Sequence, residues 1–244
     1  MPNGIFNEND FVKRELSTGE IFSFDDFVKP EFNVAKVVLT WETASDEPDL
    51  DLAAIMLNNN GRVSKKDDLV YFNSLRRWKP EMPMDSGEFD PLKGTVSEFE
   101  KDKQNFKNKE EWQDQTLPLS PDNSVIGSWD DRGNTDGPSE ERLHVRFKDI
   151  DTRDYSAVAI IATISMVDIQ KGYTFKDVFN PIVKILDAND DRVLAEYKLN
   201  ENFQNSDGVC VGYLQFNNIK NSWEFEAKKI EYNGGMLKVA NSFC

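Results

Sequence analysis

The sequence predicts an all-β protein, specifically a two-sheet β-sandwich with one short helix and an insertion of roughly 50 residues. Short runs of β-branched and aromatic residues recur along the chain and are separated by turn residues. The run VAIIAT (158–163) is apolar at almost every position, which predicts a central strand buried on both faces. The expected strands are 35–42, 51–58, 69–73, 124–129, 142–148, 157–166, 182–187, 192–199, 208–216 and 222–231.

The connections between these strands also have recognisable chemistry. Asn59-Asn60-Gly61 and the run 188–191 (Ala-Asn-Asp-Asp) supply residues that tolerate positive φ, as tight turns between strands require. A short helix is expected from Thr174 to Asn180, because Thr174 can cap it, Asp177 stands three residues further on, and Pro181 would end it.

Two parts of the chain depart from the strand pattern. Residues 1–33 carry many phenylalanines without periodicity, and we expect an N-terminal arm packed on a sandwich domain that spans 34–244. Residues 74–123 are rich in proline and mixed charge, which indicates an insertion in that domain. Within it, capping-box spacing at Thr95–Glu98 predicts a helix over about 96–112 that buries the rings of Phe99, Phe106 and Trp112.

Composition limits the possible functions. The 44 acidic and 29 basic residues give a net charge of −15, which argues against nucleic acid as a partner and suits divalent cations. The same charge is also typical of a protein that simply stays apart from its neighbours in solution.

The small numbers of histidine and cysteine residues exclude further classes of protein. One histidine, His144, and two cysteines, Cys210 and Cys244, cannot supply a four-ligand structural zinc site, and a disulfide framework is not expected. The longest apolar stretch, 157–167, is too short to span a bilayer, and the first residues lack the apolar core of a secretory signal. We therefore expect a cytoplasmic protein that is not inserted in a membrane.

The densest group of acidic residues lies between two expected strands, from Trp129 to Glu141. Ca²⁺ takes about six to eight oxygen ligands, so clustered carboxylates with glycines between them can hold it. A solvated acidic loop is the alternative, and an EF-hand does not fit because Arg132 and Thr135 stand where a ligand and the turn glycine belong. The five carboxylates are Asp130, Asp131, Asp136, Glu140 and Glu141.

A second acidic group lies at the entry to the expected strand 51–58. Strand alternation places Asp49 and Asp51 on one face and Leu50 and Leu52 on the other, so the two carboxylates can share a cation. A strand with an exposed polar edge is the alternative.

A family resemblance follows from the segments VVLTWE, DLDLAAIMLNNNGRV, KKDDLVYFNS, SVIGSWDDRGNTDGPSEERLHVRF and FNPIVKILDANDDRVLAEYKL. In order and spacing, over about 33–73 and 124–235, they resemble the TerD family of tellurite-resistance and general stress proteins. The resemblance implies a β-sandwich that binds Ca²⁺ through an Asp-x-Asp strand and an acidic, glycine-containing loop.

Several residues match the pattern that this resemblance implies, and others depart from it. Asp131 stands where the family has Asn, Trp129 replaces a glycine, and Met166-Val167 replaces a His-Asp pair that some members carry. The metal ligands expected from the resemblance and from the acidic clusters together are Asp49, Asp51, Asp68, Asp130, Asp131, Asp136, Glu140 and Glu141.

These observations predict a calcium-binding, non-enzymatic stress-response protein, with calcium ions and protein partners as its ligands. One alternative is a small-ligand module for a nucleotide or glycan, with Trp41, Trp78, Trp112 and Trp129 as stacking platforms. Another is a carboxylate-based glycan hydrolase, for which no nucleophile stands beside a base.

Overall fold

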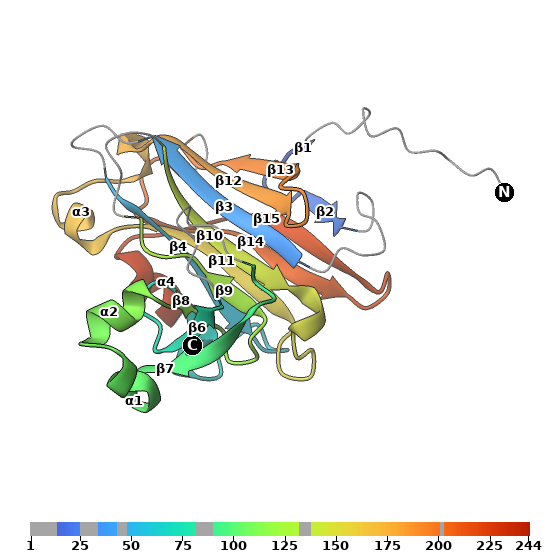
Figure 1. Cartoon of the computed structure of the whole chain (residues 1–244). Coiled ribbons are helices and arrows are strands. Elements are labelled where there is room, and N and C mark those ends of the chain that lie inside the picture. Colours follow the sequence, from blue (N-terminus) through green and yellow to red (C-terminus); the bar gives the residue numbers. More distant parts are fainter. Residues whose placement is uncertain (1–13, 25–33, 43–47, 82–89, 132–137, 201–202) are drawn as a thin grey trace.

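A computed structural model describes residues 14–24, 34–42, 48–81, 90–131, 138–200 and 203–244. Two six-stranded sheets stack as a sandwich, with β3, β10 and β12 of one sheet lying over β4, β11 and β14 of the other (Figure 1). In spatial order, sheet A contains β1 (Arg14–Glu15), β13 (Val193–Lys198), β12 (Phe179–Asp187), β3 (Val34–Glu42), β10 (Ser139–Arg146) and β9 (Val125–Gly127). Sheet B contains β2 (Ile21–Ser23), β15 (Ser222–Tyr232), β14 (Gly208–Asn217), β11 (Ala157–Ile164), β4 (Leu50–Leu57) and β5 (Leu69–Val70).

The main core lies between the two sheets, and a second one lies on the outer face of sheet B. Strand β11 contributes to both, because Ile160 packs between the sheets whereas Ile161 packs under helix α4 (Gly235–Ser242) with Val239 and Phe243. This double burial explains why the run VAIIAT is apolar on both faces, and it confirms the predicted central strand, which pairs with β4 and β14.

All ten expected strands are present, and the predicted sandwich is confirmed. Positive φ angles at Gly61 and Asp191 confirm the two predicted turns. The described part of residues 1–33 adds an edge strand to each sheet, because β1 pairs in parallel with β13 and β2 pairs with β15. Residues 1–13 and 25–33 lie outside the described residues.

The predicted insertion contains a third, small sheet against β9 of sheet A. This sheet C consists of β7 (Gly94–Glu98), β6 (Arg76–Pro80) and β8 (Leu117–Pro118), and Trp78, Leu117 and Leu119 pack on Ile126. It lies with helices α1 (Phe99–Asp102) and α2 (Lys109–Asp114) at one edge of the sandwich (Figure 1).

The prediction of one continuous helix over 96–112 was wrong. Residues 94–98 pair with β6 instead, and the Asp102 carboxylate accepts hydrogen bonds from Ser97 Oγ and the Glu98 backbone N–H where the strand ends. Asn108 then caps α2 by accepting from the Glu111 N–H. The expected burial holds for Phe106 and Trp112, and half-buried Phe99 packs against Trp112 with ring centroids 5.4 Å apart.

The other predicted helix, 174–180, is reduced to a single 3₁₀ turn, Phe175–Asp177. The Thr174 N–H donates to the Asp177 carboxylate as the spacing indicated, but β12 already begins at Phe179 and Pro181 lies inside that strand. Helix α3 (Met166–Gln170) was not predicted, and further 3₁₀ turns are Lys66–Asp68, Lys103–Asn105 and Phe147–Asp149. Within the described ranges, every helix is too short or too polar to cross a membrane.

Candidate metal centre

The candidate site lies where, among the described strands, each of the two sheets has a strand edge without a paired neighbour. Strand β5 pairs only with Ala54 and Ile55, so among the described strands the first half of β4 has a partner on one side only. Strand β9 likewise pairs only with residues 143–145 of β10, so within the described ranges no strand pairs with the start of β10 on that side. Short edge strands therefore leave space for side chains between β4 and β10.

Glu141 bridges this space. Along β10, Glu141 shares the inward face with Leu143 and Val145, which belong to the main core. Its Oε2 accepts a hydrogen bond from the Leu52 N–H of β4, at 2.5 Å. A carboxylate on sheet A thus takes the place of a missing strand partner on sheet B.

Asp51 and Asp130 complete a cluster with Glu141. Each of the three residues offers one carboxylate oxygen, and these oxygens lie within 4.8 Å of one another. Ca²⁺ binds oxygen at about 2.3–2.6 Å, so ligand atoms on opposite sides of one ion are about 5 Å apart. The separations in the cluster fit a single ion of this kind.

The electrostatics of the cluster are unfavourable for the protein alone. Burial, together with the charges of Asp51, Asp130, Asp168 and Asp131, raises the pKa of Asp49 to about 8. Burial and the charge of Asp130 raise the pKa of Asp51 to about 7. The pKa of Glu141 is also raised well above its ordinary value, first by burial and then by Asp51. Close carboxylates in a dry site disfavour their own charged forms.

Two oxygen atoms of the cluster have no hydrogen-bond partner within the described part of the chain. They are Oε1 of Glu141 and Oδ1 of Asp49, and both are buried. Buried polar atoms are normally paired, so these two carboxylate oxygens are free to accept an additional bond from a cation. The donor set consists of carboxylates without nitrogen or sulfur, which suits a hard cation such as Ca²⁺.

Asp168, which was not among the ligands expected from the sequence, holds Asp49 in place. The Asp49 N–H donates to Asp168 Oδ2 at 3.0 Å, and the Ser165 N–H donates to the Asp49 carbonyl at 2.9 Å. Burial opposes the charge of Asp168, but hydrogen bonds from Lys171, the Asp49 N–H and Ser165 outweigh it and lower its pKa. The capping spacing Ser165-x-x-Asp168, which begins inside the expected strand 157–166, was the signal that could have revealed it, because β11 ends at Ile164.

The remaining expected ligands are placed as follows. Asp131 lies close enough to raise the pKa of Asp49, and its Oδ2 accepts the Glu140 N–H at 2.9 Å. The Glu140 carboxylate itself pairs with Arg142, on the face of β10 opposite to Glu141. Asp136 lies outside the described residues.

Asp68 does not join the cluster. It precedes β5, which pairs with the far half of β4, and its carboxylate accepts from the Ser64 and Lys65 N–H groups and from the Tyr155 hydroxyl. These three bonds give Asp68 a structural role in closing the 3₁₀ turn, so we omit it from the ligand set.

The other residues singled out from the sequence are mostly buried. Burial, with the charges of Lys36 and Arg142, lowers the pKa of His144 to about 3, so this histidine is neutral. Trp41, Trp78 and Trp112 are buried as well, as core anchors would be, and Trp129 is half-buried. Both cysteines are free thiols, Cys210 buried and Cys244 exposed.

Comparison with known proteins gives the following similarities. A family model described as the TerD domain matches residues 13–84 and 115–243. A crystal structure of a homologue of telluride resistance protein (TerD) from Streptomyces coelicolor A3(2) is similar at a TM-score of 0.49 and 15% identity, covering 84% of this chain and 94% of that one. Comparison with curated proteins finds no match. The matched ranges leave out 85–114, a shorter stretch than the expected insertion 74–123.

Proposed function

The chain belongs to the TerD family, and on that premise we propose that it is a calcium-binding, non-enzymatic stress-response protein. Asp51, Asp130 and Glu141 form the centre of the calcium site, and Asp49 and Asp131 contribute from its border. The observation that supports this proposal is the unpaired, buried oxygen of Glu141 inside a cluster of mutually repelling carboxylates.

Calcium would act as a structural link between the sheets. Glu141 belongs to sheet A, Asp51 to sheet B, and Asp130 follows β9, so one ion bound to all three joins both sheets at their uncovered edges. The ion also replaces repulsion with attraction at a site where Asp51 and Glu141 are already buried. Calcium thus stabilises the folded state, and the protein acts through a surface that this stability maintains.

The site should prefer Ca²⁺ to Mg²⁺. Its carboxylates come from three separate segments, namely β4, the residues after β9, and β10. Such an arrangement tolerates irregular coordination, whereas Mg²⁺ requires near-octahedral geometry at about 2.0–2.1 Å and retains its water.

Thermal unfolding of chelator-stripped protein tests the proposal. An ion that binds only the folded state raises the melting temperature according to RT ln(1 + [L]/Kd), so saturating Ca²⁺ should stabilise the protein and Mg²⁺ should do so less. Asp130→Asn should remove most of the effect. The matched control, Asp154→Asn, changes an exposed acidic residue outside the cluster and should leave the effect intact. Equal losses in both variants would indicate nonspecific charge screening and contradict the proposal.

A further inference from the structure

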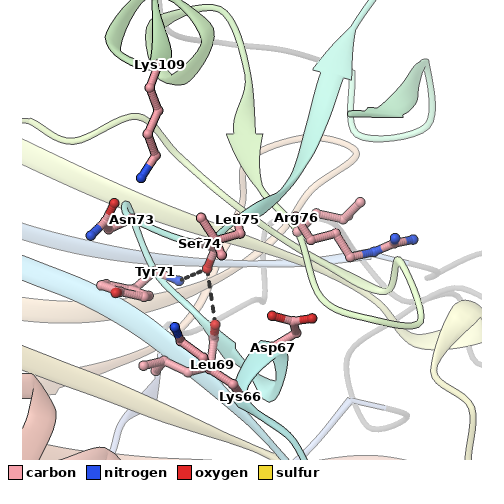
Figure 2. A pocket seen from close by; sticks show the side chains of 10 residues that line it. Lys66, Asp67, Leu69, Tyr71, Asn73, Ser74, Leu75, Arg76 and Lys109 are labelled. Carbon is pink, nitrogen blue, oxygen red and sulfur yellow. Dashed lines mark hydrogen bonds between the residues drawn. The ribbon is translucent and has the colours of Figure 1, made fainter. Parts of the chain in front are cut away.

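A separate pocket lies between the β5 edge of the sandwich and helix α2 (Figure 2). Residues 66–76 form most of its wall, and Lys109 contributes from α2. Lys109 falls in the stretch 85–114 that the family model leaves unmatched, whereas 66–76 falls in the matched part. The pocket therefore combines the part of the chain that the family model matches with a segment that it leaves unmatched.

Buried Arg77 fixes the two walls of this pocket relative to each other. Its guanidinium donates to the Phe72 carbonyl on one side and to the Gln113 and Thr116 carbonyls on the other. Gln113 Nε2 also donates to Asn73 Oδ1 at 3.0 Å. These bonds hold the C-terminal part of α2 against the segment that follows β5, so the pocket is formed before any ligand binds.

Basic residues outnumber acidic ones in the lining of the pocket, whereas acidic residues outnumber basic ones 44 to 29 in the whole chain. Lys66, Arg76 and Lys109 line it with a single acidic residue, Asp67, and because Arg76 pairs with Glu98, the two lysines supply its positive charge. Figure 2 shows the Lys109 side chain extending from α2 toward Asn73. Among the described residues, Lys66 and Lys109 form no ion pair.

The hydrogen-bond donors that remain available in the pocket favour phosphate over carboxylate. The Arg76 guanidinium already donates to Asn123 Oδ1 and to the Ser120 carbonyl, so its planar fork is not available for a carboxylate. Lysine ammonium groups act as point charges and are common phosphate binders. Leu69 and Leu75 add an apolar wall beside them.

We propose that this pocket binds a small phosphorylated molecule, with its phosphate at Lys66 and Lys109 and its apolar part against Leu69 and Leu75. The site is independent of the proposed calcium centre, because none of its lining residues belongs to the acidic cluster. Neither proposal depends on the other.

Calorimetry on the full chain in the presence of a chelator tests this site, with inorganic phosphate and pyrophosphate as probes and acetate and citrate as the carboxylate arm. Phosphate probes should bind, and Lys109→Met or Lys66→Met should each weaken them about tenfold, because each change removes a charged hydrogen bond. Both lysines are exposed, so an unchanged melting curve will show that the variants fold.

The matched control is Lys103→Met, which removes a lysine of the same segment that pairs with Glu100 outside the pocket. Its affinity for pyrophosphate should equal that of the unaltered protein. The proposal is overturned if the phosphate probes fail to bind, if carboxylates bind equally well, or if Lys103→Met weakens binding as much as Lys109→Met.

Discussion

The Glu141 carboxylate on sheet A accepts a hydrogen bond from the Leu52 backbone N–H on sheet B. This one contact places a buried acid beside Asp51 and Asp130 and leaves the second oxygen of Glu141 without a partner within the described structure. The geometry that closes the sandwich at this edge therefore also forms the acidic cluster that we propose as the cation site.

We expect Glu141→Gln to separate these two roles. The glutamine oxygen can still accept the Leu52 N–H, so the fold is retained, and removal of a desolvated charge should make the calcium-free protein at least as stable as before. The stabilisation by Ca²⁺ should fall by most of its value. Urea unfolding with and without Ca²⁺ measures both quantities.

Glu140→Gln is the control for that experiment, because Glu140 is the neighbouring acid on the opposite face of β10 and pairs with Arg142. An exposed or half-exposed ion pair contributes little, about 0–1 kcal/mol. Calcium stabilisation should be unchanged in this variant. Equal behaviour of the two glutamine variants would show that the inward face of β10 is not where calcium binds.

The stability of the calcium-free protein should decrease as pH rises from about 5 to 8. Asp49 and Asp51 have folded pKa values of about 8 and about 7, above the ordinary value of 3.8, so the folded state holds protons that the unfolded state has lost. Stability is therefore lost as pH passes through the folded pKa values. Bound Ca²⁺ replaces these protons, so its stabilising effect should grow with pH.

Melting curves over this range, with chelator and with Ca²⁺, provide the test. The difference between the two curves removes the contribution of His144, whose pKa is lowered to about 3 and which lies outside the cluster. A difference that stays constant with pH would argue that Asp49 and Asp51 do not exchange protons for calcium.

Asp168 should act on calcium through the backbone of Asp49. Asp168→Asn keeps an oxygen that can accept the Asp49 N–H, whereas Asp168→Ala removes it. We expect the alanine variant to weaken calcium binding by about tenfold or more and the asparagine variant to recover much of that loss. Calcium titration of both variants measures this. Similar affinities in the two would show that the hydrogen bond to Asp49 is not what matters.

Arg77→Met should destabilise the protein by about 2–4 kcal/mol, because it leaves the carbonyls of Gln113 and Thr116 without their buried donor. Urea denaturation measures the loss. Calcium stabilisation should be retained, because Arg77 has no contact with the acidic cluster. A stability equal to that of the unaltered chain would show that α2 is held by other contacts.

Strand alternation explains how much of the metal centre could be predicted from the sequence. It placed Leu50 and Leu52 in the core and correctly separated them from Asp49 and Asp51. Alternation could not show which of Glu140 and Glu141 faces inward, because the expected strand began at 142. Strand β10 begins at Ser139 and includes both residues. Asp68 was expected as a ligand from the family resemblance alone, and its partner, the Tyr155 hydroxyl, could not be foreseen because it is 87 positions away in the chain.

The helix expected over 96–112 shows where prediction from local sequence spacing fails. Local spacing at Thr95–Glu98 satisfied the rule for a helix start, but pairing of the same residues with β6 outweighed it. Strand pairing joins residues distant in the sequence, and local patterns do not encode it. Burial of Phe106 and Trp112 was predictable because it needs only hydrophobicity, whatever the backbone around them.

Calorimetric titration of Ca²⁺ into the chelator-stripped protein tests the central claim most directly. We predict saturable binding with at least one ion per chain, weaker binding of Mg²⁺, and loss of binding in Asp51→Asn, since that change removes one of the three clustered carboxylates. The absence of saturable Ca²⁺ binding, or binding that Asp51→Asn leaves unchanged, would contradict the assignment of this cluster as a calcium site.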